Sequence, residues 1–319
     1  MSFLLEEIEK AGTIAIGGHV RPDGDCIGSC MGLYCYIMDN YAGKEVTVFV
    51  EDIPASFEYL KKDEALEKKS ETYELFISLD CGSPDRLGDA EKIFEKSGRT
   101  VNIDHHISNT EFAEKNHVEA EASSTSEVLC ALLDMEKISF FAAQAFYTGI
   151  VHDTGVFKHS NTGMRTMETA GKLMQKGIPF GQIIDESFYQ KTYRQLQIMG
   201  RCLLESVRVM DGKCLFSVVS KRVMEFYGAK PSDLDGVIDQ LRTTEGVEVA
   251  ILLTEKETVE YKVSMRSNQI VDVSRIASFF GGGGHIRAAG CTVKGSAFDV
   301  INNITEHIER QLKESTDVE

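Results

Sequence analysis

Long apolar runs are missing from this sequence of 319 residues. No stretch approaches the ~20 consecutive apolar residues that a membrane-spanning helix needs. The first residues also carry neither the basic segment nor the cleavage site of a secretory signal. We therefore expect a cytoplasmic, globular protein with no membrane partner, and a chain of this length has room for two domains.

Paired cysteine motifs are also missing. Eight cysteines are scattered along the chain without a single Cys-x-x-Cys pair, which argues against a structural zinc site. Cys26 and Cys30 lie one helical turn apart, and we expect both to be small buried apolar residues. Reduced thiols of this kind agree with a cytoplasmic location.

Positive charge is scarce. The sequence has 34 Lys and Arg against 50 Asp and Glu, a formal net charge of −16. This argues against a protein that coats long duplex nucleic acid by neutralising phosphates. A small phosphorylated substrate is still compatible with it, because metal ions can supply positive charge locally.

Three ionisable residues follow one strand-like segment in succession. Residues 100–103 form an apolar run, and Asp104, His105 and His106 come directly after it. In an open parallel α/β sheet, ligands bind at the carboxyl ends of the strands. By itself the triplet is a weak signal, because three polar residues can equally form a solvated loop.

The first predicted strand, residues 13–18, leads into a second polar group. His19, Asp23 and Asp25 follow it, in a tight turn before a helix predicted from residue 27. One alternative is that Asp25 only caps that helix while Asp23 serves the turn. The three residues together favour a metal or phosphate site.

Two more aspartates follow apolar segments. Residues 75–79 form a strand that ends in Asp80, and an apolar helix over 140–151 leads into Asp153. Helices predicted over 57–69 and 85–96 alternate with the strands, a pattern typical of βαβ units and a parallel sheet. Three strands that end in Asp or His are difficult to attribute to capping.

The remaining chain has a different predicted arrangement of helices and strands. Residues 186–205 are predicted to form a helical connector between a first domain, 1–185, and a smaller α+β domain with a mixed sheet, 206–319. Four glycines at 281–284, followed by His285, favour a loop whose N–H groups cradle an anion. The alternative is a helix C-cap followed by a hairpin, which needs only one or two of these glycines. Arg266 ends a neighbouring strand.

Eight ionisable residues of the first domain thus gather at predicted strand or helix ends: His19, Asp23, Asp25, Asp80, Asp104, His105, His106 and Asp153. Imidazole and carboxylate ligands without thiolate suit Mn²⁺, with Mg²⁺, iron or Co²⁺ as substitutes. So many carboxylates in one crevice need cations to offset their repulsion. Two divalent cations that share a carboxylate are the recurrent arrangement for phosphoester hydrolysis.

These motifs, in this order, resemble the DHH phosphoesterase superfamily, and the segment of residues 281–285 resembles its DHH-associated C-terminal domain (DHHA1). The resemblance covers nearly the whole chain. It is closest to the stand-alone nanoRNase/pAp-phosphatase (NrnA-type) members, which are related to RecJ exonucleases. It implies a metal-dependent phosphoesterase that acts on short RNA oligonucleotides and on 3′-phosphoadenosine-5′-phosphate (pAp).

The resemblance also implies a role for each site residue. His19, Asp23 and Asp80 would hold one cation, and Asp25, Asp80, His105 and Asp153 the other. His106 would face the substrate phosphate, and Asp104 would orient its neighbours. In the second domain the substrate would be bound by Arg266, Gly282, Gly283, Gly284 and His285.

Three alternatives are open at this point. Another member of the superfamily could hydrolyse cyclic di-AMP or linear dinucleotides with the same metal site. A family II inorganic pyrophosphatase is less favoured, because its second domain lacks the glycine-rich segment. A non-catalytic nucleotide-binding protein is disfavoured by the complete set of ligands. The sequence leaves the oligomeric state open, with a homodimer as one alternative.

Overall fold

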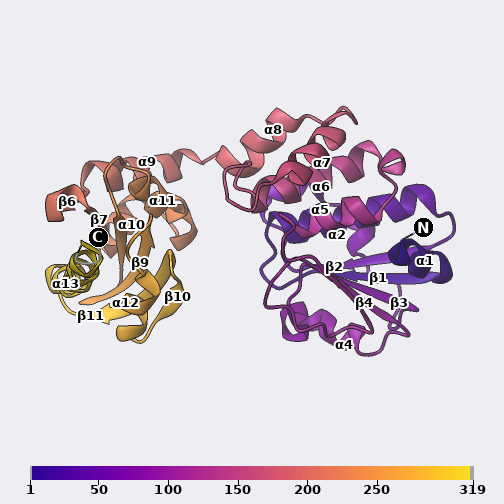
Figure 1. Cartoon of the computed structure of the whole chain (residues 1–319), viewed down its shortest axis with the longest axis horizontal. Helices are drawn as coiled ribbons and strands as arrows, with labels where there is room; N and C mark the ends of the chain where they lie inside the picture. The colour runs from indigo at the N-terminus through magenta and orange to yellow at the C-terminus, as the bar shows by residue number, and fades with distance from the viewer. Residues whose placement is uncertain (1, 317–319) are drawn as a thin grey trace. The chain divides into compact units, whose positions relative to one another are not determined.

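The computed structural model describes residues 2–316, so the predicted domain limits at residues 1 and 319 lie outside the described residues. The chain divides into two compact units, with the division between Gln190 and Lys191 (Figure 1). Among the described residues, no helix combines the length and the apolar character needed to cross a membrane.

The first unit is built on a five-stranded sheet in which every strand runs parallel to its neighbours, in the order β2-β1-β3-β4-β5. The strands are β1 (Thr13–Gly17), β2 (Glu45–Phe49), β3 (Leu75–Leu79), β4 (Thr100–Asp104) and β5 (Lys115–Val118). The central strand β3 is buried along its whole length, as expected for a parallel sheet covered on both faces. The predicted parallel α/β architecture is therefore confirmed.

Helices cover both faces of this sheet (Figure 1). One layer contains α2 (Gly24–Asn40), α5 (Thr125–Leu132), α6 (Phe140–Asp153) and α7 (Met164–Met174), and the other contains η2 (Pro84–Ala90) and α4 (Glu91–Phe94). Two glycines let α2 and α6 pack at close range. A Cβ on Gly28 would lie 2.5 Å from the Ala145 carbonyl oxygen and 2.8 Å from the Gly149 nitrogen.

Two predicted helices are shorter than expected. Residues 57–69 form the 3₁₀ turn η1 (Ala55–Leu60) and the single turn α3 (Asp63–Leu66). Residues 85–96 are divided between η2 and α4, because Gly88 adopts φ 56°, outside the helical region. The remaining elements of this unit are α1 (Phe3–Lys10), η3 (Met135–Lys137), α8 (Phe180–Ile184) and the π-helical turn η4 (Asp185–Tyr189).

The second unit contains a six-stranded sheet in the order β10-β11-β9-β8-β7-β6. Its strands are β6 (Val207–Val209), β7 (Cys214–Val219), β8 (Val249–Glu257), β9 (Glu260–Ser267), β10 (Gly283–His285) and β11 (Ala288–Lys294). Among the described strands of this second sheet, only β7 and β8 pair in parallel. The predicted mixed sheet is thus confirmed.

The helices of the second unit are α9 (Tyr193–Leu204), α10 (Lys221–Tyr227), α11 (Val237–Arg242), α12 (Val273–Phe279) and α13 (Ala297–Thr316), with 3₁₀ turns η5 (Met210–Gly212) and η6 (Pro231–Leu234). Helix α9 falls inside the segment expected to be a connector. Its residues Ile198 and Cys202 are buried in one cluster with Leu215 and Val237. The helix is therefore part of the core of the second unit.

The glycine-rich segment also differs from the expected loop. Gly283, Gly284 and His285 form β10, the edge strand that pairs antiparallel with β11. A Cβ on Gly282 would lie 2.2 Å from the Gly290 carbonyl oxygen, and one on Gly284 would lie 2.5 Å from that of Ala288. Close backbone packing therefore accounts for two of the four glycines.

Candidate metal centre

Three central strands of the first sheet bring the candidate residues together. Because β1, β3 and β4 are parallel neighbours, their carboxyl ends meet at one edge. His19 follows β1, Asp80 follows β3, and Asp104 ends β4. All three side chains are buried, although ionisable groups are rarely buried without a partner.

One group of possible ligands combines His19, Asp23 and Asp80. The His19 Nε2 atom lies 3.5 Å from Asp80 Oδ2 and 3.7 Å from Asp23 Oδ2. Asp23 is also the N-cap of α2, since its Oδ1 accepts hydrogen bonds from the amides of Asp25 and Cys26. Asp23 therefore both caps α2 and takes part in the turn before it. The Asp25 side chain is not used as the cap.

A second group combines Asp25, His105 and Asp153, and a third combines Asp80, His105 and His106. The His105 Nε2 atom lies 3.0 Å from Asp153 Oδ2 and 3.6 Å from Asp80 Oδ1. Asp153 is the last residue of the apolar helix α6. Asp80 belongs to two of the three groups, with one oxygen facing His19 and the other facing His105.

The two imidazoles are oriented as metal ligands usually are. Nδ1 of His19 lies 2.9 Å from the Val20 carbonyl oxygen, and Nδ1 of His105 lies 3.3 Å from that of Ala122. A carbonyl oxygen can only accept, so each Nδ1 donates its proton, and each Nε2 is the atom that faces the aspartates and would bind a cation once its own proton is displaced. This carbonyl support is typical of histidines that bind metal.

The charges at this edge also fit a cation. Burial, together with the nearby carboxylates of Asp80 and Asp153, raises the pKa of Asp25 well above its usual value. Burial and the charge of Asp80 raise the pKa of Asp153 as well. Ionised carboxylates crowded in a buried place are costly unless a cation compensates them. The donor set and its excess of negative charge therefore fit divalent metal ions.

His106 differs from the other two histidines. Its Nδ1 lies 2.7 Å from Asp104 Oδ1, and its side chain is 46% exposed. This hydrogen bond is the main cause that raises the pKa of His106. Asp104 in turn accepts from the His105 amide at 2.8 Å and from Asn109 Nδ2 at 2.6 Å. Asp104 thus fixes His106 and leaves its Nε2 free.

Two residues that the sequence did not single out support the centre. Asn109 holds the second oxygen of Asp104, and Thr125 contacts both Asp25 and Asp80. The spacing of Ser124 and Glu127 does locate the start of α5, where Ser124 accepts from the Glu127 amide. That spacing carries no information about the distant aspartates.

Two further histidines lie beside the centre without joining it. His152 packs against Phe57 and Phe188, and its Nε2 lies 2.9 Å from the Ser187 hydroxyl. Burial lowers the pKa of His152 to about 4. His159 contacts the Asp153 carbonyl oxygen through Nδ1. Among the residues that the structure describes, neither histidine belongs to a group of possible metal ligands.

The second unit carries its two candidate side chains in one row. Arg266 of β9 pairs with Ala288 of β11, which pairs with His285 of β10. Residues paired directly across antiparallel strands project from the same face, so Arg266 and His285 flank the small Ala288 side chain. Arg266 has one acidic neighbour at long range, with its Nε 3.6 Å from Asp239 Oδ1.

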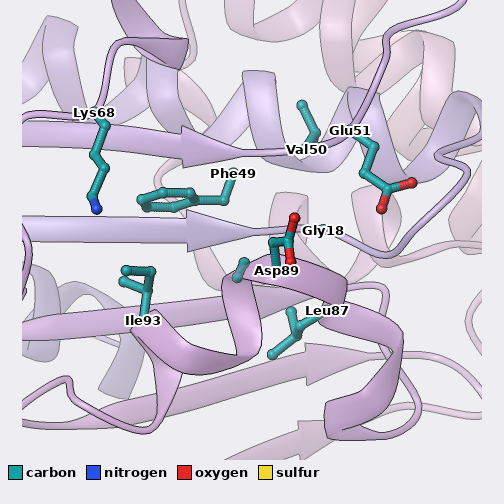
Figure 2. A pocket seen from close by; sticks show the side chains of 9 residues that line it. Gly18, Phe49, Val50, Glu51, Lys68, Leu87, Asp89 and Ile93 are labelled. Carbon is teal, nitrogen blue, oxygen red and sulfur yellow. The ribbon is translucent and has the colours of Figure 1, made fainter.

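A separate hollow of about 350 Å³ lies between the end of β2 and the η2–α4 segment (Figure 2). Its apolar wall includes Phe49, Leu87 and Ile93. None of the candidate metal ligands lines it. This hollow is therefore distinct from the centre at the strand ends.

Comparison with known families agrees with this geometry. The family model described as "DHH family, N-terminal domain" matches residues 13–150, and the DHHA1 domain model matches residues 211–314. A protein from Thermus thermophilus named "Bifunctional oligoribonuclease and PAP phosphatase NrnA" is 32% identical over 97% of this chain and 94% of its own length. The chain belongs to the DHH family.

Other relatives of this DHH-family chain extend the comparison. The Bacillus subtilis protein with the same name, NrnA, is 26% identical and covers 98% of both chains. The Bacillus subtilis "Cyclic-di-AMP phosphodiesterase GdpP" is 25% identical over 98% of this chain but only 49% of its own length. The crystal structure of an exopolyphosphatase-related protein from Bacteroides fragilis has the same fold, with a TM-score of 0.80, 24% identity and coverage of 96% and 94%.

Proposed function

We propose that this chain is a divalent-metal-dependent phosphoesterase that hydrolyses short oligoribonucleotides to mononucleotides and pAp to AMP. The convergence of buried aspartates and histidines at the carboxyl ends of β1, β3 and β4 carries the proposal. The substrate class comes from the NrnA relatives, which this chain matches along nearly its whole length.

Two groups of residues would hold the cations, for which we propose Mn²⁺. The first is His19, Asp23 and Asp80, and the second is Asp25, Asp80, His105 and Asp153, so Asp80 is shared. Imidazole and carboxylate ligands suit manganese, and the absence of thiolate argues against structural zinc. A pair of such ions supplies an activated water and neutralises charge on the reacting phosphate.

His106 would serve the substrate phosphate directly. Its Nδ1 hydrogen bond to Asp104 raises its pKa, so the ring tends to carry protons on both nitrogens. The half-exposed Nε2–H can then donate to a nonbridging phosphate oxygen, and the charge of the ring favours that contact. Asp104, which is fully buried, would act by holding the ring in place.

Arg266, His285 and the glycines Gly282, Gly283 and Gly284 of the second unit would bind the remainder of the nucleotide. The row of Arg266, Ala288 and His285 places two side chains that can bind phosphate on one face of the sheet. A guanidinium is well suited to phosphate, because its N–H groups match two phosphate oxygens at once.

A second candidate function is hydrolysis of cyclic di-AMP or linear dinucleotides. Its support is the similarity to GdpP along 98% of this chain. Half of that relative has no counterpart here, whereas the NrnA relatives match end to end. The proposal therefore gives first place to short RNA and pAp.

The test is a substrate panel with Mn²⁺ present and then chelated. The panel contains a ribo-dinucleotide, a five-nucleotide RNA, pAp, cyclic di-AMP and pyrophosphate, and the products are mononucleotides or phosphate. We expect metal-dependent turnover of the short RNAs and pAp. Preference for cyclic di-AMP would select the second function, and bound metal without any turnover would favour a nucleotide-binding protein.

A further inference from the structure

Thr125, the first residue of α5, contacts two candidate metal ligands at once. Its backbone amide donates to Asp25 Oδ2 at 2.7 Å, and its hydroxyl donates to Asp80 Oδ1 at 3.0 Å. The residue is fully buried. In this contact the Thr125 hydroxyl donates and the Asp80 oxygen accepts.

The contact with Asp80 falls on the oxygen that faces the histidine pair. Asp80 Oδ1 lies 3.6 Å from His105 Nε2, whereas Oδ2 lies 3.5 Å from His19 Nε2. A rotation of the carboxylate would move both oxygens away from these positions. The Thr125 hydroxyl is the only side-chain hydrogen-bond donor besides histidine that reaches Asp80 among the described residues.

The backbone of Asp80 also has an uncommon conformation. Asp80 has φ 58°, in the left-handed region that non-glycine residues rarely occupy. Its amide is fixed by the Ile103 carbonyl oxygen, but the side chain needs a separate restraint. Thr125 provides it from another part of the fold, 45 residues farther along the chain.

The start of α5 restrains Asp25 from the same place. The amides of Thr125 and Ser126 donate to its two oxygens, at 2.7 and 3.0 Å. The N-terminus of a helix also carries partial positive charge that favours a carboxylate there. Asp25 and Asp80 belong to different groups of possible ligands, and Thr125 is the residue that touches both.

We propose that Thr125 is a positioning residue. It fixes the carboxylate of Asp80 between the two proposed metal positions and holds it in a fixed place relative to the Asp25 carboxylate. The inference rests on the proposed function, since it concerns the same centre. Loss of the hydroxyl should free the Asp80 carboxylate to rotate. The ion shared with Asp25, His105 and Asp153 should then bind more weakly, because its contact to Asp80 Oδ1 is the one that Thr125 orients.

The test is calorimetric titration of Mn²⁺ into the metal-free full chain, together with electron paramagnetic resonance of the loaded protein. Thr125→Val keeps the shape and the backbone amide but removes the hydroxyl. We expect one of the two Mn²⁺ binding steps to lose about tenfold in affinity, the lower end of the range for residues that support metal ligands. The spectrum of a spin-coupled Mn²⁺ pair should weaken in parallel.

Two further variants separate positioning from plain stability. Thr125→Ser restores a hydroxyl and should restore both the affinity and the coupled spectrum. Thr47→Val removes another fully buried threonine hydroxyl, one that contacts Tyr73 and the Glu67 backbone. It should lower the melting temperature without changing either Mn²⁺ step. If Thr125→Val does not fold, Thr125→Ala repeats the measurement without the branched side chain.

The outcomes are distinct. Wild-type affinities and an intact coupled spectrum in Thr125→Val or Thr125→Ala would overturn the inference and leave the proposed function standing. Equal weakening of both steps in Thr47→Val would also overturn it. Failure of the wild-type chain to bind Mn²⁺ at all would overturn the metal centre itself.

Discussion

The two units hold their candidate residues in opposite ways. In the first unit, Asp25, Asp80 and Asp104 are almost completely buried, and each accepts hydrogen bonds from other residues of that unit. In the second unit, His285 is exposed on an edge strand and Arg266 has a single long ion pair with Asp239. The protein itself holds the candidate side chains of the first unit in place, whereas those of the second unit have fewer supporting contacts.

The difference follows from what each region is proposed to do. Binding two cations requires charged oxygens and nitrogens at fixed separations, so the supporting contacts must be in place before the ions arrive. Contacts to a nucleotide can be completed by the ligand, so the residues that bind it need fewer supporting contacts beforehand. We therefore expect substitutions in the first unit to reduce turnover and those in the second to reduce binding.

The strongest expected effect is that of Asp80→Ala. Asp80 lies within reach of His19, His105 and His106, so its loss would remove a ligand from both proposed metal positions. We expect turnover of pAp and short RNA with Mn²⁺ to fall by a factor on the order of 10³ or more, comparable with the loss of a principal electrostatic group. Steady-state phosphate release measures it.

Asp85→Ala is the matched control, because Asp85 is exposed in the segment that follows Asp80. It should leave turnover unchanged. Substantial Mn²⁺-supported hydrolysis by Asp80→Ala would contradict the shared position of Asp80.

Gly149→Ala tests whether the close packing of Gly149 against Ser126 and Asp25 affects stability and Mn²⁺ binding. A Cβ at this position would lie 2.1 Å from Ser126 Oγ and 2.5 Å from Asp25 Oδ1. We expect a loss of about 1–3 kcal/mol in the free energy of unfolding, typical of overpacking, together with weaker Mn²⁺ binding. Chemical denaturation and calorimetry give the two quantities.

Gly171→Ala in α7 is its control, since a Cβ there meets nothing within 4 Å. It should stabilise the fold by about 0.5–1 kcal/mol, because alanine is the better residue in a helix. A destabilised Gly171→Ala with a normal Gly149→Ala would reverse the expected order and contradict the packing argument.

The sequence predicts the edge where the site lies more reliably than the contacts that support it. Strands that end in His19, Asp80 and Asp104 are visible because apolar runs stop at polar residues, and parallel strands must bring those ends together. Thr125 could not be found this way. Its two contacts join segments 45 and 100 residues apart, and only the packing of α5 on the sheet brings them into reach.

The same limit explains the errors in the second unit and in the short helices. Four glycines predict a flexible loop, but two of them are required by the close approach of β10 and β11. Helix 85–96 fails at Gly88, where φ is positive. Strand β5 could not be predicted from an apolar run. None of its four residues is buried, and three of them are polar. Tertiary packing overrides the local pattern in each case.

The pH dependence of metal affinity is a smaller test of the first region. Burial lowers the pKa of His105, but its hydrogen bond to Asp153 and the nearby aspartates raise it to about 10. Below that value the metal-free ring keeps its proton, which a cation must displace. Affinity should thus rise with pH between 6 and 8, by about tenfold per pH unit for each proton displaced.

Calorimetry in buffers of different ionisation enthalpy counts the displaced protons, and the expected result is at least one proton released per protein. An Mn²⁺ affinity that stays constant over this range would mean that the ligands are already free of protons. That result would contradict the raised pKa of His105 in the metal-free protein.

The smallest expected effect is that of Arg266→Ala, which tests the candidate substrate-binding residues of the second unit. If the guanidinium binds a substrate phosphate, its loss should raise KM for pAp about tenfold, the factor that corresponds to about 1.4 kcal/mol of charge-assisted hydrogen bonding. The kcat value and both Mn²⁺ affinities should change less than about twofold, because the row of Arg266, Ala288 and His285 contains none of the candidate metal ligands. Arg275→Ala, an exposed arginine of α12 in the same unit, should leave KM unchanged. A fall in kcat at constant KM would instead give Arg266 a part in the chemical step, and the division of labour between the two units would no longer hold.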